Sequence, residues 1–285
     1  MIPFERIVHP ENFRLERPGG QNVLRFLPDV PFAEARLFMR GPLLDGTGGK
    51  LNLLQERLAP LSVGTLPLLA PRQVHGVVVL PSDRSLALPS QPDADGILLT
   101  SFEVEASLRF GDCAPVLVLP SPEWVRCNRP WALLLHSGYK GTVLNIVRAG
   151  LLEVERVMGG DAVRSASAWV GPCVSGDSYP RTMEEWTERG LAVFHPENVR
   201  RAGDGHVHFD LAGELRRQLT DCGLDGGRIF LSGMDTVAEA VCYSHRRGEA
   251  DRMFLHARLV GRGTGRKTNF ENLSSDMPQE GRHRG

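Results

Sequence analysis

The sequence predicts an α+β protein, a single domain in which mixed β-sheets pack against helices. Apolar runs of four to five residues recur through the middle of the chain between turn residues, which is typical of buried strands. Segments with apolar residues at helical spacing lie between these runs. Strands and helices do not alternate strictly, which argues against a purely parallel sheet.

The chain has 285 residues, a length that suits one large domain or two small ones. Residues 1–30 are polar and rich in Pro and Gly, so we expect an irregular lead-in there. Residues 31–260 carry the periodic segments and are expected to form the folded domain. Residues 261–285 contain almost no apolar side chains, so we expect a disordered tail.

The expected elements follow in chain order. A short strand is predicted at residues 35–39, and a glycine-rich loop at 46–50 lacks the spacing of a P-loop. Further strands are predicted at residues 77–80, 96–100, 115–119, 132–135, 167–170, 228–231 and 253–260.

Two helices are predicted from apolar residues on one face. The first covers residues 142–158 and ends at Gly159-Gly160, since glycine commonly follows a helix end. The second covers residues 208–222 and ends at Gly223.

Charge and cysteine content restrict the class of protein. The chain has 33 basic and 34 acidic side chains, so no overall field favours nucleic acid or a membrane surface. The five cysteines form no C-x-x-C pair, which argues against a disulfide framework and a zinc ribbon. The first residues lack the apolar region of a signal peptide, so a cytoplasmic location is expected.

Three polar residues lie at the ends of predicted strands. They are His75, Cys113 and His136. Two imidazoles and a thiolate form a good donor set for Zn²⁺, and three protein ligands leave a fourth position for water or substrate. The residue types alone equally allow a metal-free pair with Cys113 as nucleophile and His136 as base.

At these residues the chain resembles the laccase-domain, or YfiH-like, family, whose members are also labelled polyphenol oxidases or peptidoglycan editing factors. The matching segments are Leu51-Asn52-Leu53, Gln73-Val74-His75-Gly76, Asp93-Ala94-Asp95-Gly96, Asp112-Cys113-Ala114-Pro115-Val116-Leu117, His136-Ser137-Gly138-Tyr139-Lys140-Gly141, Gly171-Pro172-Cys173-Val174 and Tyr243-Ser244-His245-Arg246-Arg247. The match runs in order from about residue 48 to residue 260.

The resemblance implies a YfiH-like single α+β domain and a zinc site made by His75, Cys113 and His136. It also implies purine nucleosides and phosphate as small-molecule partners. The implied reactions are phosphorolysis of adenosine, inosine, guanosine or methylthioadenosine, and deamination of adenosine. A multicopper site is not expected, because the chain has a single H-x-H pair, His206-Val207-His208, interpreted as a surface loop.

Six further residues are candidates for substrate binding. Lys140, Arg246 and Arg247 are candidates for holding phosphate, since a dianion needs cations. Asp112 is a candidate for orienting a metal ligand. Cys173 and Asn52 are candidates for lining the pocket.

The sequence departs from the family pattern near the expected pocket. Ser137, Tyr139 and Lys140 replace the usual Ala, Trp and Arg, and His245 replaces a Tyr. The segment Ala250-Asp251-Arg252 replaces T-G-R. The substrate preference of this half of the pocket is therefore expected to differ.

Two other functions are compatible with the sequence. One is a cysteine hydrolase that edits a peptidoglycan precursor, with Cys113 as nucleophile. The other is a non-catalytic binding protein of the same fold. The oligomeric state and the preferred purine are not encoded in any motif of the chain.

Overall fold

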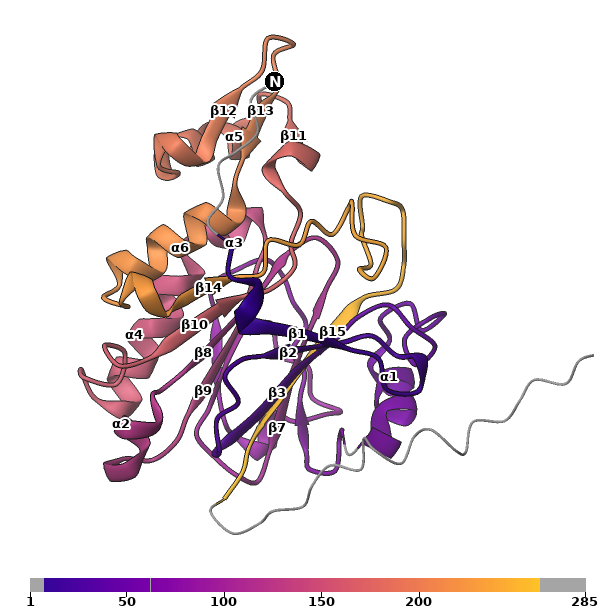
Figure 1. Cartoon of the computed structure of the whole chain (residues 1–285), viewed down its shortest axis with the longest axis vertical. Coiled ribbons are helices and arrows are strands. Elements are labelled where there is room, and N and C mark those ends of the chain that lie inside the picture. The colour runs from indigo at the N-terminus through magenta and orange to yellow at the C-terminus, as the bar shows by residue number, and fades with distance from the viewer. Residues whose placement is uncertain (1–7, 62, 262–285) are drawn as a thin grey trace, which may run out of the picture.

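Two six-stranded sheets form the centre of the molecule, with helices on the outer face of the second (Figure 1). The computed structural model describes residues 8–61 and 63–261. The expectation of a disordered tail therefore lies outside the described residues, apart from Gly261. The predicted class, α+β with mixed sheets and helices in one domain, is confirmed.

The first sheet joins the N-terminal strands to the last strand of the described residues. Its order is β1 (Phe13–Glu16), β2 (Val23–Phe26), β3 (Ala33–Phe38), β15 (Met253–Leu259), β7 (Glu105–Phe110) and β4 (Leu68–Leu69). All neighbours are antiparallel except β4 and β7.

The second sheet carries most of the strands that the sequence predicted. Its order is β14 (Ile229–Leu231), β10 (Ser167–Val170), β8 (Ala114–Leu119), β9 (Ala132–Ser137), β6 (Gly96–Leu99) and β5 (Val79–Pro81). A third, three-stranded sheet has the order β11 (Pro180–Arg181), β13 (Val207–Phe209) and β12 (Val199–Arg201).

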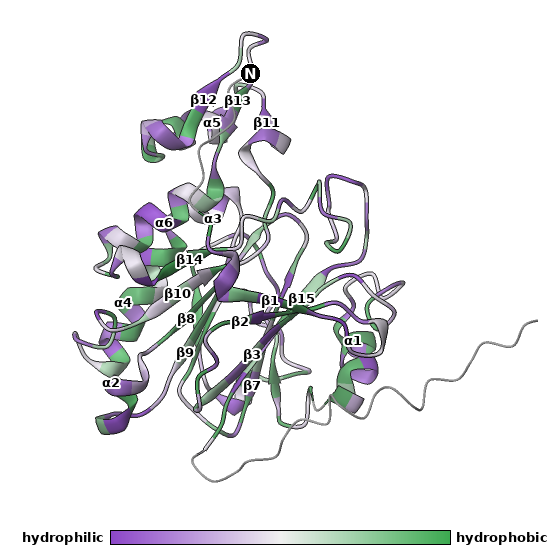
Figure 2. Ribbon diagram, in the orientation of Figure 1, coloured by the Kyte–Doolittle hydropathy of each residue, from purple (hydrophilic) through white to green (hydrophobic). Residues whose placement is uncertain are grey.

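Strand β9 shows why these strands were recognisable. Its side chains alternate, so Ala132 and Leu134 join the core between the two large sheets, whereas Leu133 and Leu135 join the core under the helices. A strand buried on both faces reads as a continuous apolar run. Figure 2 shows the apolar strands inside and the two-faced colouring of the outer helices.

The helices are short and cover defined faces. They are α1 (Leu51–Leu58), α2 (Pro122–Cys127), α3 (Tyr139–Val143), α4 (Ile146–Met158), α5 (Glu185–Val193) and α6 (Leu211–Asp221). Helices α4 and α6 pack on the second sheet, and α5 lies beside the third sheet (Figure 1). Within the described ranges no helix is long and apolar enough to cross a bilayer.

The N-terminal segment differs from the expected irregular lead-in. Strands β1 and β2 form an antiparallel pair joined by the turn Pro18–Gly20. Val23, Leu24 and Phe26 are buried, and this apolar contact fixes the segment to the first sheet. The Pro and Gly residues serve the turn and leave the strands on either side intact.

The single helix predicted at residues 142–158 is two helices, α3 and α4. Asn145 separates them with a left-handed backbone, φ 61° and ψ 59°. Its side-chain oxygen accepts a hydrogen bond from the Arg148 N–H and so caps α4. Asn tolerates this backbone region and is a favoured N-cap, which apolar periodicity does not reveal.

The interpretation of His206-Val207-His208 as a surface loop is wrong. Val207 and His208 belong to β13, and both are buried. The Nδ1 of His208 lies 2.7 Å from the carbonyl oxygen of Gly176. The second predicted helix accordingly begins at Leu211, three residues later than expected.

Truncation of a side chain on β9, the strand buried on both faces, tests this packing. Leu134→Ala is expected to lower the free energy of unfolding by about 2–5 kcal/mol, because it removes a fully buried side chain between the large sheets. Urea unfolding measures the change. The control Leu152→Ala, on α4 with Leu152 51% exposed, should change stability by less than about 0.5 kcal/mol. Equal losses in both variants would contradict the assignment of the core.

Candidate metal centre

His75, Cys113 and His136 meet at one end of the second sheet. Cys113 lies in the turn before β8, and β8 pairs with β9 so that Pro115 is opposite His136. His75 precedes β5 on the far side of β6. The potential ligand atoms of the three residues all lie within 4.8 Å of one another. The sequence-predicted trio is therefore brought together.

A fourth residue, Asp95, organises two of the three. Its carboxylate is fully buried and lies 2.8 Å from Nδ1 of His136. It also accepts hydrogen bonds from the backbone N–H groups of Val74, His75 and Gly76, at 3.2, 3.0 and 2.7 Å. One carboxylate thus fixes both the His136 ring and the turn that carries His75.

The backbone around the centre is strained. His75 and Asp112 adopt φ values of 62° and 88°, which are uncommon for residues other than glycine. Each such residue costs about 1–3 kcal/mol and persists because its surroundings hold it. The three N–H bonds to Asp95 hold the His75 turn, and they also leave the imidazole free to face Cys113.

The charges in the centre are coupled. Burial raises the pKa of the Cys113 thiol, but His136 and then His75 lower it more, to about 6. Burial lowers the pKa of His136, but the Cys113 thiolate and Asp95 raise it to about 9. In the metal-free protein this coupling therefore favours a thiolate facing an imidazolium over the neutral pair. A bound cation would take the place of that proton.

The donor set and the space around it fit a metal ion. Since Nδ1 of His136 faces Asp95, its Nε2 is the nitrogen left to bind, and Nε2 of His75 lies 3.7 Å from the Cys113 sulfur. Two imidazoles and a thiolate are zinc-type ligands. A Cβ on Gly138 would lie 2.7 Å from that sulfur and 3.0 Å from the His75 ring, so glycine keeps this space open.

His75, Cys113 and His136 line a cavity of about 910 Å³. This volume is near the upper end for small-molecule sites, about 300–1,000 Å³. The cavity lining is strongly cationic. Among the described residues it includes the basic side chains Arg109, Lys140, Arg181, Arg246 and Arg252, against the one carboxylate of Asp112.

Three of the six predicted substrate-binding residues line this cavity. Lys140 is exposed, with its Nζ 4.9 Å from the centre of the Trp186 ring. The Arg246 guanidinium lies 4.2 Å from the centre of the Tyr179 ring.

Asp112 lines the cavity, but its carboxylate accepts hydrogen bonds from Thr236 Oγ1 and the Arg246 backbone N–H, both at 2.8 Å. It therefore ties loops together and contacts neither histidine ligand by a hydrogen bond.

The other three predicted residues are outside the cavity lining. Asn52 is exposed on α1. Cys173 is buried and its backbone forms a bridge with Asp235. The third, Arg247, has its guanidinium engaged within its own loop.

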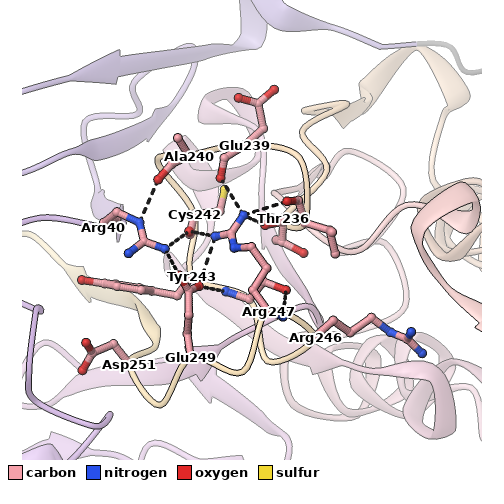
Figure 3. Close-up of polar contacts among 12 residues, drawn as sticks. Arg40, Thr236, Glu239, Ala240, Cys242, Tyr243, Arg246, Arg247, Glu249 and Asp251 are labelled. Carbon is pink, nitrogen blue, oxygen red and sulfur yellow. Dashed lines mark hydrogen bonds and ion pairs between the residues drawn. The ribbon is translucent and has the colours of Figure 1, made fainter.

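The Arg247 guanidinium organises the loop that ends at β15 (Figure 3). It donates to the carbonyl oxygens of Thr236, at 2.8 Å, and Cys242, and it pairs with Glu249. Arg40 donates to the Cys242 carbonyl from the other side, at 2.9 Å, and also pairs with Glu249. These contacts leave Arg246 pointing away from the network in Figure 3.

Sequence reasoning missed Asp95 and three of the cavity cations. Asp95 was visible in the Asp93-Ala94-Asp95 motif, directly before β6, where a buried carboxylate marks a supporting residue. Arg252 lies in the segment Ala250-Asp251-Arg252, which departs from the family pattern. Arg109 and Arg181 carry no local signal and are identified only by the fold.

Comparison with known proteins gives consistent matches. The family model described as multi-copper polyphenol oxidoreductase laccase matches residues 53–261. A Mycobacterium bovis protein named purine nucleoside phosphorylase is 31% identical over 179 residues, which cover 61% of this chain and 65% of the relative. A protein of the same name from Bacteroides thetaiotaomicron is 28% identical over 159 residues, or 54% of this chain and 52% of the relative.

Two solved structures share the fold. The Bacillus licheniformis hypothetical protein YfiH has a TM-score of 0.73 at 19% identity, covering 87% of this chain and 99% of that one. YlmD from Geobacillus stearothermophilus has a TM-score of 0.72 at 21% identity, covering 88% and 99%.

Loss of the thiolate should abolish tight metal binding. Cys113→Ala is expected to bind Zn²⁺ at least about 100-fold more weakly than the parent protein, because two neutral imidazoles remain from a charged three-ligand set. Dialysis against a zinc buffer followed by metal analysis measures it. The exposed Cys127 offers the control Cys127→Ala, which should bind like the parent. Unchanged metal content in Cys113→Ala would contradict the assignment of Cys113 as a metal ligand.

Loss of the Asp95 charge should weaken the centre without removing a ligand. Asp95→Asn is expected to lower metal affinity about 10- to 100-fold, because the His136 ring loses its carboxylate acceptor. The matched control is Asp93→Asn, whose exposed carboxylate pairs with Arg72. A folded Asp95→Asn variant with parental affinity would show that Asp95 does not support the ligands; far-UV circular dichroism verifies folding.

Proposed function

The chain belongs to the family described as multi-copper polyphenol oxidoreductase laccase, and from that premise we propose that it is a zinc-dependent purine nucleoside phosphorylase. The observation that carries the proposal is the His75, Cys113 and His136 cluster in the wall of a large, cationic cavity. The names of the mycobacterial and Bacteroides relatives support the choice of reaction. The chain spans 65% of the length of the mycobacterial relative.

The donor set supports zinc over a multicopper centre. Within residues 8–61 and 63–261, one group of His, Cys, Asp or Glu side chains is close enough to hold a metal. Multicopper centres need several histidine-rich sites, and His206 and His208 contact Asp204 and Gly176 instead. A single site with one thiolate and two imidazoles matches catalytic zinc.

The chain's own residues account for binding and orientation. Bound zinc would supply a Lewis acid that polarises an oxygen of water or phosphate. Asp95 keeps the proton of His136 on Nδ1 and so directs Nε2 toward the ligand position. The cavity cations attract phosphate and lower the cost of bringing a dianion beside a nucleoside.

The proposed substrates are adenosine, inosine, guanosine and methylthioadenosine, with phosphate attacking C1′ of the ribose as the purine leaves. Deamination of adenosine is proposed as a second reaction of the same cavity, in which water attacks C6 of the purine and ammonia leaves. The two reactions share the purine nucleoside and differ in the second reactant.

A cysteine hydrolase is the second candidate, and one observation favours it. The lowered pKa of Cys113 beside His136, with Asp95 behind His136, is also the order of groups in a nucleophile, base and orienting-carboxylate arrangement. The two candidates differ in their need for metal. A peptidoglycan precursor would be the substrate class of the hydrolase.

Product analysis tests the proposed reaction. Zinc-loaded protein with adenosine and phosphate should give adenine and ribose-1-phosphate, and with adenosine alone it should give inosine. Chelation, or Cys113→Ala, should lower kcat/KM about 1,000-fold, because loss of several kcal/mol of Lewis-acid stabilisation is a loss of that order. Full activity of the metal-free protein on a peptidoglycan precursor, with none on nucleosides, would favour the hydrolase instead.

A further inference from the structure

Arg109 and Arg252 form a pair of like charges in the cavity wall. Arg109 lies on β7, and Arg252 directly precedes β15, whose first residue pairs with Phe110. Both side chains are half-buried. Neither forms an ion pair with a carboxylate anywhere in the described part of the chain. Burial lowers the pKa of Arg109, and the charge of Arg252 lowers it further.

The fold holds both guanidinium groups in place with backbone groups. Arg109 donates to the carbonyl oxygens of Gly49, at 3.4 Å, and Pro71, at 3.2 Å. Nη1 of Arg252 donates to the carbonyl oxygens of three residues of its own loop, at 2.7–2.9 Å. Neutral acceptors of this kind orient an arginine without cancelling its charge.

Two glycines make room for the Arg252 side chain. A Cβ on Gly49 would lie 2.9 Å from Arg252 Cγ, and one on Gly111 would lie 2.9 Å from Arg252 Cδ. Gly49 therefore contacts both members of the pair, since its carbonyl accepts from Arg109. Nε and Nη2 of Arg252 and Nε of Arg109 form no hydrogen bond with the described residues.

The other cavity cations are engaged differently. Arg181 pairs with Glu184 and lies over the Tyr139 ring. Arg246 and Lys140 lie over aromatic rings, where their charge is partly compensated. Arg109 and Arg252 are the two that combine backbone anchoring, mutual repulsion and free donors.

We propose that Arg109 and Arg252 form the subsite for inorganic phosphate in this cavity. A dianion placed between the two guanidinium groups relieves their repulsion and accepts the free N–H groups, and Arg presents them in a fork that matches phosphate oxygens. The role of the bound ion as the attacking reactant rests on the proposed phosphorolysis, whereas its binding does not. The sequence predicts Arg247 as one candidate for this role, but its guanidinium is instead bonded to carbonyl oxygens of its own loop.

Calorimetric titration with sodium phosphate, at constant ionic strength, tests the subsite on the zinc-loaded protein. Arg252→Gln and Arg109→Gln are each expected to weaken phosphate binding about 10- to 100-fold, the effect of losing a hydrogen bond between charged groups. Arg252→Lys should give an intermediate loss, because it keeps the charge but not the fork. The control Arg164→Gln removes a side chain that is 79% exposed and should leave binding unchanged.

Several outcomes would overturn the subsite. They are absence of phosphate binding by the parent protein, equal binding by Arg252→Gln, or loss of binding in Arg246→Gln but not in Arg252→Gln. Arg252-dependent binding of adenosine monophosphate without binding of free phosphate would assign the pair to a nucleotide ester and also overturn it.

Activity assays keep this subsite distinct from the proposed reaction. If phosphate binds through Arg252 but no nucleoside is cleaved, the phosphorylase proposal fails and the subsite stands. If nucleosides are cleaved with a phosphate KM that Arg252→Gln leaves unchanged, the reaction stands and the subsite fails. Both proposals together predict that Arg252→Gln raises the KM for phosphate and leaves the KM for the nucleoside unchanged.

Discussion

The buried carboxylate of Asp95 is the group on which the candidate site depends. Removing a carboxylate from water is costly, and burial alone would raise its pKa. The hydrogen bond and charge of His136 and the N–H groups of Gly76 and His75 outweigh that effect and hold the pKa below its usual value. The same bonds stabilise the left-handed turn at His75. One set of hydrogen bonds therefore both positions His136 and stabilises the turn that carries His75.

The sequence predicted the parts of the fold that are buried on both faces or closed by glycine. The runs that became β6, β8 and β9 are continuous and apolar because helices cover one face and the first sheet covers the other. Strand β7 lacks a continuous apolar run, since Glu105, Ser107 and Arg109 alternate with apolar residues in the pattern of a half-buried strand. Glu105 is nevertheless fully buried, paired with His256 at 2.8 Å. Local polarity cannot reveal a partner 151 residues away.

The candidate site likewise contains residues that the local sequence predicts and residues that only the fold brings together. His75, Cys113 and His136 were predictable because each lies at a strand end, where a sheet presents side chains to a crevice. The pair of Arg109 and Arg252 was not, because it depends on the register of β7 and β15 and on the space left by Gly49 and Gly111. The near balance of 33 basic and 34 acidic side chains hides this local concentration of positive charge.

The loop around Arg247 separates folding from recognition. Its shape is set by a guanidinium that faces inward and by Glu249 and Arg40, none of which lines the cavity. The neighbouring Arg246 lines the cavity, with its backbone N–H donating to Asp112 and its guanidinium over the Tyr179 ring. The Arg246 side chain takes no part in the hydrogen bonds that hold the loop, so the lining of the cavity can change at this position while those bonds remain. Scaffold contacts and cavity lining are thus divided between two adjacent residues.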